Sequence, residues 1–202
     1  MITVHHLNES RSHRILWLLE EIGKPYKVAP YQRDAATRLA PPELKAVHPL
    51  GKSPVLVDGK RTLFESAAII EYLIRRYARG RLAPREGSND WIEYIQWLHY
   101  AEGSAILPLI LALYVSRLGE GGAPLHPRID SEIANHLGFI DQRLKGREFI
   151  AGRRFSGADV QIGYVLDAAD SRGRLEPFAD AKRYLEALRA RPAYIRATAR
   201  GG

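Results

Sequence analysis

The chain has 202 residues, of which 46% are hydrophobic and 26% are charged, and it carries a formal net charge of +7. This length and apolar content allow a substantial core in one large domain or two small ones. The chain contains no cysteine. This absence excludes disulfides, thiolate metal sites, a Cys-X-X-Cys redox motif and a cysteine nucleophile.

The positive charge is concentrated in the first 79 residues, which hold 13 Lys and Arg against 8 Asp and Glu, whereas residues 80–202 hold 17 against 15. No basic stripe interleaved with aromatic residues accompanies this excess, so we expect a small anionic ligand and no nucleic-acid partner. The N-terminus lacks a signal-peptide pattern, and no apolar run approaches the roughly 18 residues of a membrane span. We therefore expect a cytoplasmic protein without a membrane partner.

The opening of the chain predicts a strand, a helix and a second strand. Residues 2–7 are apolar and β-branched, and residues 25–28 resume that pattern after a helix that ends at Gly23. A right-handed crossover makes the two strands parallel. The polar residues 8–12 lie between the first strand and the helix, where open α/β sheets place their ligands.

A loop and a short helix are expected in residues 33–47, followed by a hairpin with Asp58-Gly59 at its turn and a helix over residues 65–78. The proline that begins the hairpin leaves the backbone of Ser53 available to pair with a ligand. The helix start at Glu65 and Ser66 offers N–H groups and a hydroxyl to a carboxylate, while the Glu65 carboxylate suits an ammonium. The two ends of this segment therefore suit an amino-acid-like or peptide-like ligand.

Polar residues without apolar periodicity separate this α/β part from a helical remainder. We predict a thioredoxin-like domain of order βαβ–αββα at residues 1–79, a linker at 80–88 and an all-α domain at 89–202. The first helix of the second domain is predicted to run to about residue 118 with a kink at Pro108. Four later helices are predicted. Two span about 127–145 and about 180–190, one begins at a capping box formed by Ser156 and Asp159 and flanked by Phe155 and Val160, and one begins at Pro192.

Four motifs in this order resemble the cytosolic glutathione transferases, specifically their fungal–bacterial branch. The family's first strand, active-site loop and first helix resemble HLNESRSHRILWLLEEIGKPY, and its approach to a cis-proline resembles PPELKAVHPLGKSPVL. Its glutathione-binding corner resembles LFESAAIIEYL, and the capping box of its sixth helix resembles FSGADV. The resemblance covers nearly the whole chain. It implies a homodimer that transfers reduced glutathione to hydrophobic electrophiles without a tightly bound cofactor.

The resemblance also assigns roles to the glutathione-binding residues. Pro54 would be cis, and the Ser53 backbone would pair with the cysteinyl part of glutathione. Glu65 and Ser66 would hold the γ-glutamyl end, and Lys52 would neutralise the glycyl carboxylate. These roles agree with the ligand chemistry inferred above from charge and from the helix terminus.

Catalysis requires a glutathione thiolate, so a hydrogen-bond donor or positive charge must lower the thiol pKa from about 8.5. Related proteins use a tyrosine, serine or cysteine after the first strand, and this loop has neither tyrosine nor cysteine. We expect Ser10 to donate its hydroxyl, with Ser12, Arg11 or loop backbone amides as alternatives; Ser12 also suits a helix N-cap. Glu9 aligns near the catalytic position, where a carboxylate would oppose thiolate formation.

Candidates for the electrophile site lie on the long helix, although packing is the commoner role for each: Tyr94, Trp97, Tyr100 and Glu102. The seven histidines show no metal-ligand spacing, so no metal is expected. Two other functions remain open. One is reduction of disulfides or peroxides by two glutathione molecules, and the other is a non-catalytic glutathione-binding module, which Glu9 favours.

Overall fold

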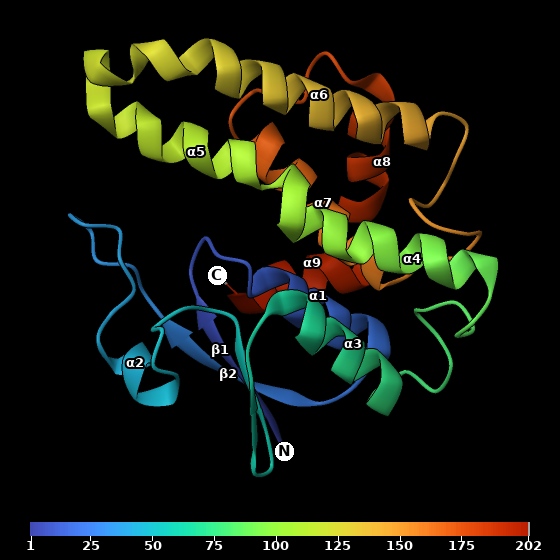
Figure 1. Cartoon of the computed structure of the whole chain (residues 1–202). Helices are drawn as coiled ribbons and strands as arrows, with labels where there is room; N and C mark the ends of the chain where they lie inside the picture. Colours follow the sequence, from blue (N-terminus) through green and yellow to red (C-terminus); the bar gives the residue numbers. More distant parts are fainter. Residues whose placement is uncertain (202) are drawn as a thin grey trace. The chain divides into compact units, whose positions relative to one another are not determined.

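A four-stranded mixed sheet in the order β2–β1–β3–β4 organises the first part of the chain. In the computed structural model, which describes residues 1–201, β1 (Ile2–Leu7) pairs in parallel with β2 (Tyr26–Tyr31). On its other side β1 pairs antiparallel with β3 (Val55–Asp58), which pairs antiparallel with β4 (Arg61–Leu63). The parallel β1–β2 pair, joined through α1 (His13–Ile22), confirms the predicted opening (Figure 1).

The hairpin turn lies one residue later than predicted. Asp58 is still paired with Arg61, so the two-residue turn is Gly59-Lys60 rather than Asp58-Gly59. Gly59 takes a φ of 62°, a left-handed conformation that glycine adopts without a steric cost. The Asp58 carboxylate accepts hydrogen bonds from the Tyr72 and Tyr77 hydroxyls.

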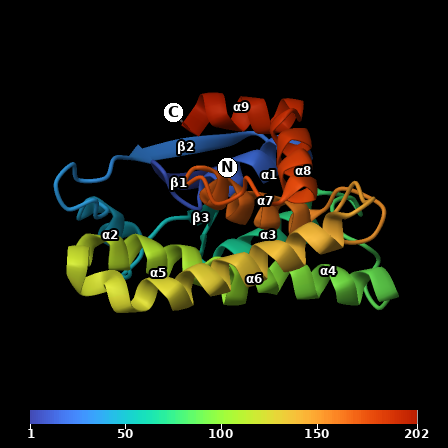
Figure 2. The same cartoon turned by 90° about the horizontal axis from the view of Figure 1, so that it is seen from above.

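Helix α1 is surrounded by other elements, and its apolar residues are therefore buried on nearly all sides. It packs against α3 (Ser66–Tyr77) and against α9 (Pro192–Gly201), which also runs along β2 (Figure 2). Gly23 ends α1 with a φ of 75°, as predicted. The short helix expected before the hairpin is α2 (Glu43–Val47).

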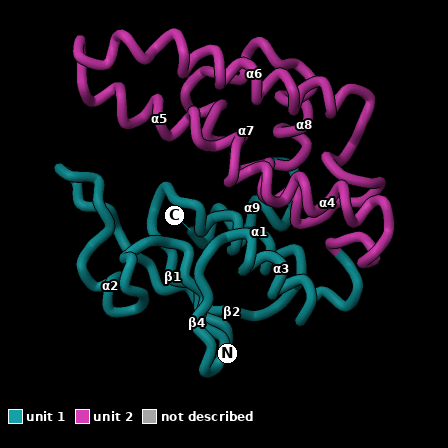
Figure 3. The backbone as a smooth tube through the Cα atoms, in the orientation of Figure 1, with its two compact units in different colours: residues 1–81, 189–202 teal, residues 82–188 magenta. Residues whose placement is uncertain are grey.

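By its internal contacts the chain divides into Met1–Arg81 with Arg189–Gly202, and Leu82–Leu188 (Figure 3). This division differs from the prediction that placed residues 189–202 in the helical domain. The reason is that α9 buries Ala193 and Ala197 and packs on α1, a contact between residues far apart in sequence. The first unit is therefore built from both ends of the chain.

The second unit is helical, as predicted. Its elements are α4 (Asn89–Tyr100), a π-helical segment (Ala101–Ala105), α5 (Leu107–Val115), a 3₁₀ segment (Ser116–Leu125), α6 (His126–Leu144), α7 (Gly157–Asp170) and α8 (Ala179–Arg189). The expected kink at Pro108 is wrong: Pro108 lies in the first turn of α5, where a missing N–H costs little, and the helix is interrupted earlier by the π-helical segment. Helices α5 and α6 lie side by side (Figure 1).

The capping box at the start of α7 is present as predicted. Asp159 is fully buried, and its carboxylate accepts hydrogen bonds from the Ser156 N–H (2.7 Å), the Ile150 N–H (2.9 Å) and the Tyr184 hydroxyl (2.6 Å). These donors come from the helix start, the preceding loop and α8. Asp159 therefore joins three segments of the second unit.

The helical stretch Asn89–Leu144 contains an 18-residue window with a mean hydropathy of 1.4, of which 39% is buried. By length and composition it could cross a membrane, which corrects the expectation that no apolar stretch approaches this length. The window passes because few charges interrupt it around α5. Core helices that do not span a membrane pass the same test of length and composition.

Candidate functional site

The turn before β3 is anchored to β1 through the Ser53 side chain. The Ser53–Pro54 peptide bond is cis. The Ser53 hydroxyl donates to the His5 carbonyl (2.8 Å) and accepts from the Leu7 N–H (3.3 Å). Within residues 1–201, the N–H and C=O of Ser53 make no hydrogen bond. This backbone is therefore available to pair with a ligand.

The start of α3 is open to an anionic group. Glu65 precedes the helix with a φ of 66° and an exposed side chain, and it supplies no side-chain cap to the helix N–H groups. Ser66 is 3% exposed, and its oxygen accepts a long hydrogen bond from Arg14 (3.5 Å). Because the guanidinium only donates, the Ser66 hydroxyl hydrogen is left for a ligand oxygen. A helix N-terminus with this hydroxyl suits a carboxylate.

Arg14 is a site residue that the sequence interpretation missed. It is 1% exposed, and it lies within the apolar run of α1. An arginine in a buried helical stripe is unusual enough to have served as a signal. Its positive charge adds to the anion preference at Ser66.

The two candidate serines of the loop after β1 have different surroundings. The Ser10 and Ser12 hydroxyl oxygens are 2.7 Å apart, and Ser12 is also 2.8 Å from His6 Nδ1. Ser12 occupies the N-cap position of α1, as expected, but it is fully buried and its side chain makes no capping hydrogen bond to the helix. Ser10 is 7% exposed and lies 3.5 Å from the Ser53 hydroxyl. Ser10 is thus the serine beside the turn.

The carboxylate of Glu9 is drawn away from these serines by a neighbouring loop. Glu9 has a φ of 50° and forms an ion pair with Arg38. Arg33 holds the two loops together, because its guanidinium donates to the carbonyls of Asn8 (3.1 Å), Glu9 (3.3 Å) and Arg38 (3.0 Å). The negative charge expected to oppose a thiolate is therefore countered by Arg38, which the sequence interpretation did not identify.

Lys52 and Arg11 flank this arrangement. Lys52 is exposed next to the cis-proline turn and makes no ion pair within the described residues. Arg11 is half-buried in the loop between the two serines. The first unit contains all of the candidate glutathione-binding and thiol-activating residues, namely Ser10, Lys52, Ser53, Glu65 and Ser66.

No group of three acidic or histidine side chains that could hold a metal ion occurs among residues 1–201.

The predicted electrophile-site residues lie in the second unit. Tyr94 is 1% exposed and Trp97 is 6% exposed, and the Trp97 ring stacks on Phe139 with ring centres 5.3 Å apart. The Tyr100 hydroxyl is 2.6 Å from His136 Nδ1, and burial raises the pKa of Tyr100 to about 12. Tyr94 and Trp97 are thus occupied by packing. Glu102 is half-buried in the π-helical segment.

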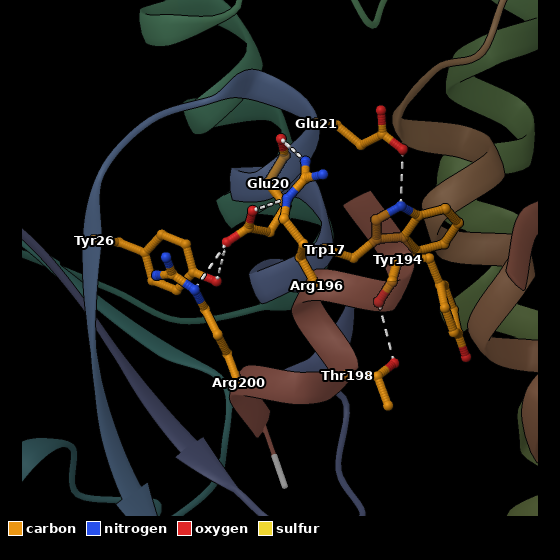
Figure 4. A network of polar contacts seen from close by, with 8 residues as sticks. All are labelled: Trp17, Glu20, Glu21, Tyr26, Tyr194, Arg196, Thr198 and Arg200. Atoms are coloured by element: carbon orange, nitrogen blue, oxygen red, sulfur yellow. Dashed lines mark hydrogen bonds and ion pairs between the residues drawn. The ribbon is translucent and has the colours of Figure 1, made fainter. Parts of the chain in front are cut away.

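Helix α9 is fastened to α1 by the Glu20 carboxylate (Figure 4). Glu20 accepts hydrogen bonds from the Tyr26 hydroxyl (3.0 Å) and from Arg196 Nε (2.8 Å), and it pairs with Arg200 (3.2 Å). Its side chain is 10% exposed. The cluster therefore joins α1, β2 and α9 around one nearly buried carboxylate.

A second carboxylate on α1 holds the beginning of α9. Glu21 pairs with Arg191 (2.6 Å) and accepts a hydrogen bond from Trp17 Nε1 (2.9 Å). The Tyr194 ring packs edge-on against Trp17 (5.1 Å between ring centres) and against His13 (5.0 Å), as Figure 4 shows for Trp17. These contacts fix α9 along its length.

Comparison with family models identifies both parts of the chain. Residues 1–75 match the model for the glutathione S-transferase N-terminal domain, and residues 123–196 match that for the glutathione S-transferase C-terminal domain. A curated relative, glutathione S-transferase 3 of Schizosaccharomyces pombe, is 35% identical over 96% of this chain and 85% of its own length.

Solved structures show the same similarity. A glutathione S-transferase from Actinobacillus pleuropneumoniae superposes with a TM-score of 0.91 and 35% identity, over 100% of this chain and 93% of that one. A glutathione transferase family member from Pseudomonas fluorescens, solved with two glutathione molecules bound, gives a TM-score of 0.79 and 31% identity over 97% and 91% of the two chains. These three relatives come from a fungus and two bacteria, in agreement with the branch expected from the sequence motifs, whereas the plant glutathione S-transferases among the relatives are 26–29% identical.

Proposed function

Because the chain belongs to the glutathione S-transferase family and is thus a glutathione transferase, we propose that it binds reduced glutathione at the Ser53–Pro54 turn and the start of α3. The bound thiolate then attacks a carbon of a small hydrophobic electrophile, such as a chlorinated aromatic: a carbon–sulfur bond forms, and the carbon–chlorine bond breaks with release of chloride. Glutathione serves as co-substrate, and no tightly bound cofactor takes part.

The arrangement of free hydrogen-bonding groups carries the binding proposal. Glutathione has a peptide-like middle and a charged group at each end. The Ser53 backbone suits the cysteinyl amide, the α3 start with Ser66 suits the γ-glutamyl carboxylate, and Glu65 suits the γ-glutamyl ammonium. Lys52 then meets the glycyl carboxylate beside the same turn.

Ser10 is the residue we assign to thiol activation. Its oxygen lies 3.5 Å from that of Ser53, next to the backbone that would hold the cysteinyl part. Ser12 is fully buried behind it and cannot contact a ligand in this conformation. A hydroxyl that donates to sulfur stabilises the thiolate and so lowers the thiol pKa. Arg11 and the loop amides are the remaining donors.

The test is the ultraviolet absorbance of bound glutathione thiolate across pH, for the parent protein and for Ser10→Ala and Ser12→Ala. We expect a thiol pKa below its free value in the parent, a return toward that value in Ser10→Ala and no rise in Ser12→Ala. A rise in Ser12→Ala alone would move the role to Ser12. Glutathione bound with an unshifted thiol in all three would refute activation and leave a non-catalytic glutathione-binding module.

A second candidate activity is reduction of a disulfide by two glutathione molecules, which yields two thiols and oxidised glutathione. It is favoured by the Pseudomonas fluorescens relative, whose structure holds two glutathione molecules. A chain without cysteine would supply no thiol of its own to this reaction. Turnover of a chlorinated aromatic against turnover of hydroxyethyl disulfide separates the two activities.

We also propose a cytoplasmic homodimer. Large apolar side chains are exposed on and after α5, as a helix that packs against a second subunit requires: Leu107 (53%), Leu111 (42%), Tyr114 (58%) and Leu118 (60%). Light scattering after size-exclusion chromatography measures the oligomeric state. A monomer at micromolar concentration would contradict this part of the proposal.

A further inference from the structure

A row of polar contacts connects the end of α9 with the cis-proline turn. The His6 ring lies in its middle, with Nε2 3.0 Å from the Gly201 carbonyl and Nδ1 2.8 Å from the Ser12 hydroxyl. Ser12 lies 2.7 Å from Ser10, which lies 3.5 Å from Ser53. His6, Ser10 and Ser12 are all buried, with at most 7% exposure. The row therefore runs through the interior of the first unit.

The Gly201 carbonyl at one end of this row sets the direction of the hydrogens from His6 to Ser10. A carbonyl oxygen can only accept, so His6 Nε2 must carry its hydrogen. Burial lowers the pKa of His6, against an opposing effect of the Gly201 hydrogen bond, so the ring is neutral and Nδ1 is an acceptor. Ser12 then donates to Nδ1 at 2.8 Å, a shorter contact than the 3.4 Å to the Leu7 carbonyl, and its oxygen is left to accept the hydrogen of Ser10.

This order determines what Ser10 can offer to a ligand. Its hydrogen faces two acceptors, the Ser12 oxygen at 2.7 Å and the Ser53 oxygen at 3.5 Å, because the Ser53 hydrogen goes to the His5 carbonyl. The shorter contact turns the hydrogen inward to Ser12, and the Ser10 oxygen also receives the Ser12 N–H at 3.2 Å. To donate to a thiolate, Ser10 must release its bond to Ser12. Ser12 is fully buried, and no other donor among residues 1–201 replaces that bond. A thiolate therefore competes with Ser12 for the Ser10 hydrogen.

We propose that His6 is a positioning residue that sets the thiol pKa of bound glutathione by fixing the direction of the Ser10 hydroxyl through Ser12. The proposal rests on the proposed function, because it takes Ser10 as the group beside the sulfur. His6 itself touches neither glutathione nor the reacting atoms. It acts by withholding the Ser10 hydrogen, so the parent protein forms less thiolate than the same site without this constraint.

Helix α9 takes part in this arrangement because it selects the ring tautomer. Without the Gly201 carbonyl, either ring nitrogen of His6 could carry the hydrogen. Gly201 packs closely against the His6 ring, because a methyl group added at Gly201 would lie 3.2 Å from both Nε2 and Cε1 of His6. Contacts made by the end of the chain thus reach Ser10 through two side chains.

The deciding experiment compares the thiolate titration of bound glutathione in His6→Gln and Ser12→Ala with that of the parent. The Gln amide keeps a donor toward Gly201 but has no acceptor at the place of Nδ1, so Ser12 is free to donate to Ser10. In both variants we expect the thiolate-to-thiol ratio at a given pH to rise about tenfold, the scale of one hydrogen bond. His5→Gln is the matched control, because the His5 ring bonds to Tyr31 (2.9 Å) and should leave the ratio unchanged.

The outcomes separate this proposal from the proposed function. One outcome is that Ser10→Ala raises the thiol pKa, while His6→Gln and Ser12→Ala either leave the thiol pKa at the parent value or raise it as well. That outcome refutes the role of His6, and the role of Ser10 in thiol activation stands. If Ser10→Ala changes nothing, the proposed activation fails first. Nitrogen NMR of the ligand-free protein tests the premise without glutathione: we expect His6 protonated at Nε2 only, and an Nδ1–H tautomer would overturn the proposal even where a variant does not fold.

Discussion

Replacement of Glu20 by glutamine tests how strongly α9 is held on α1. The carboxylate accepts from Tyr26 and from two arginines, and its side chain is 10% exposed. Glutamine has nearly the same shape and keeps an acceptor for the Tyr26 hydroxyl. Glu20→Gln therefore removes the charge and its two ion pairs while leaving the packing in place.

The size of the effect follows from the exposure of the arginines. Arg196 and Arg200 are 54% and 51% exposed, so each pair is worth the ~0.2–1 kcal/mol of a solvent-exposed ion pair rather than the larger value of a buried one. We expect a total loss of about 1–1.5 kcal/mol, which lowers Tm by about 2–5 °C in a chain of this length. Differential scanning fluorimetry with urea unfolding measures both quantities.

The stability difference between the parent and Glu20→Gln should depend on pH. Burial alone would raise the pKa of Glu20, but hydrogen bonds from Arg196 and Tyr26 and the charges of both arginines outweigh it and hold the pKa below its ordinary value of 4.5. A carboxyl with a lowered pKa stabilises the folded state above its unfolded pKa, and this stability is lost as the pH falls through the folded pKa. The difference between parent and Glu20→Gln should thus disappear in acid.

A matched control is Glu148→Gln, which neutralises an exposed carboxylate on the second unit. It should leave Tm within about 1 °C of the parent, because surface substitutions of this kind change stability little. The reasoning is refuted if the Glu20 and Glu148 variants melt alike at neutral pH. It also fails if the loss in Glu20→Gln persists unchanged below the pKa of the carboxyl.

Three further predictions concern the buried carboxylate, a histidine and the ligand. Asp159→Ala should cost about 3–5 kcal/mol in urea unfolding, because four buried donors lose their acceptor, while Tyr184→Phe should cost only about 1 kcal/mol; equal losses would contradict this account. Burial, with smaller effects of His6 and Arg14, lowers the pKa of His13 from 6.5 to about 4, so the folded state favours the neutral ring and loses stability as the pH falls from 6.5 to about 4. His13→Gln should lose less stability over that pH range in thermal melts. Parallel pH profiles of the parent and His13→Gln would contradict this prediction. Lys52→Met should raise the calorimetric Kd for glutathione about 3–10-fold, whereas Lys60→Met, on the hairpin turn, should not.

Local patterns were sufficient to predict most of the elements. Gly23 ends α1 and the Ser156–Asp159 box begins α7 because both signals act within a few residues of the backbone they control. The cis bond before Pro54 was expected only from the family resemblance, since an ordinary X-Pro bond is cis about 5% of the time.

The parts that could not be predicted depend on contacts between distant residues. His6 meets Gly201 across 195 residues of chain, so no spacing in the sequence reveals the pair. Arg38 counters Glu9 across 29 residues and through two loops of irregular backbone. The interruption of the long helix by a π-helical segment has no composition signal comparable to proline, and Pro108 drew the prediction to the wrong place.

The return of α9 to the first unit has a consequence for synthesis on the ribosome. Residues 82–188 form a unit that is continuous in sequence, whereas the first unit needs Arg189 and the residues after it. At a translation rate of about 5–20 residues per second, α1 waits roughly 9–36 seconds for its partner helix. During that interval the α1 surface that α9 later covers is exposed to the nascent-chain environment, so the unit begun first is completed last.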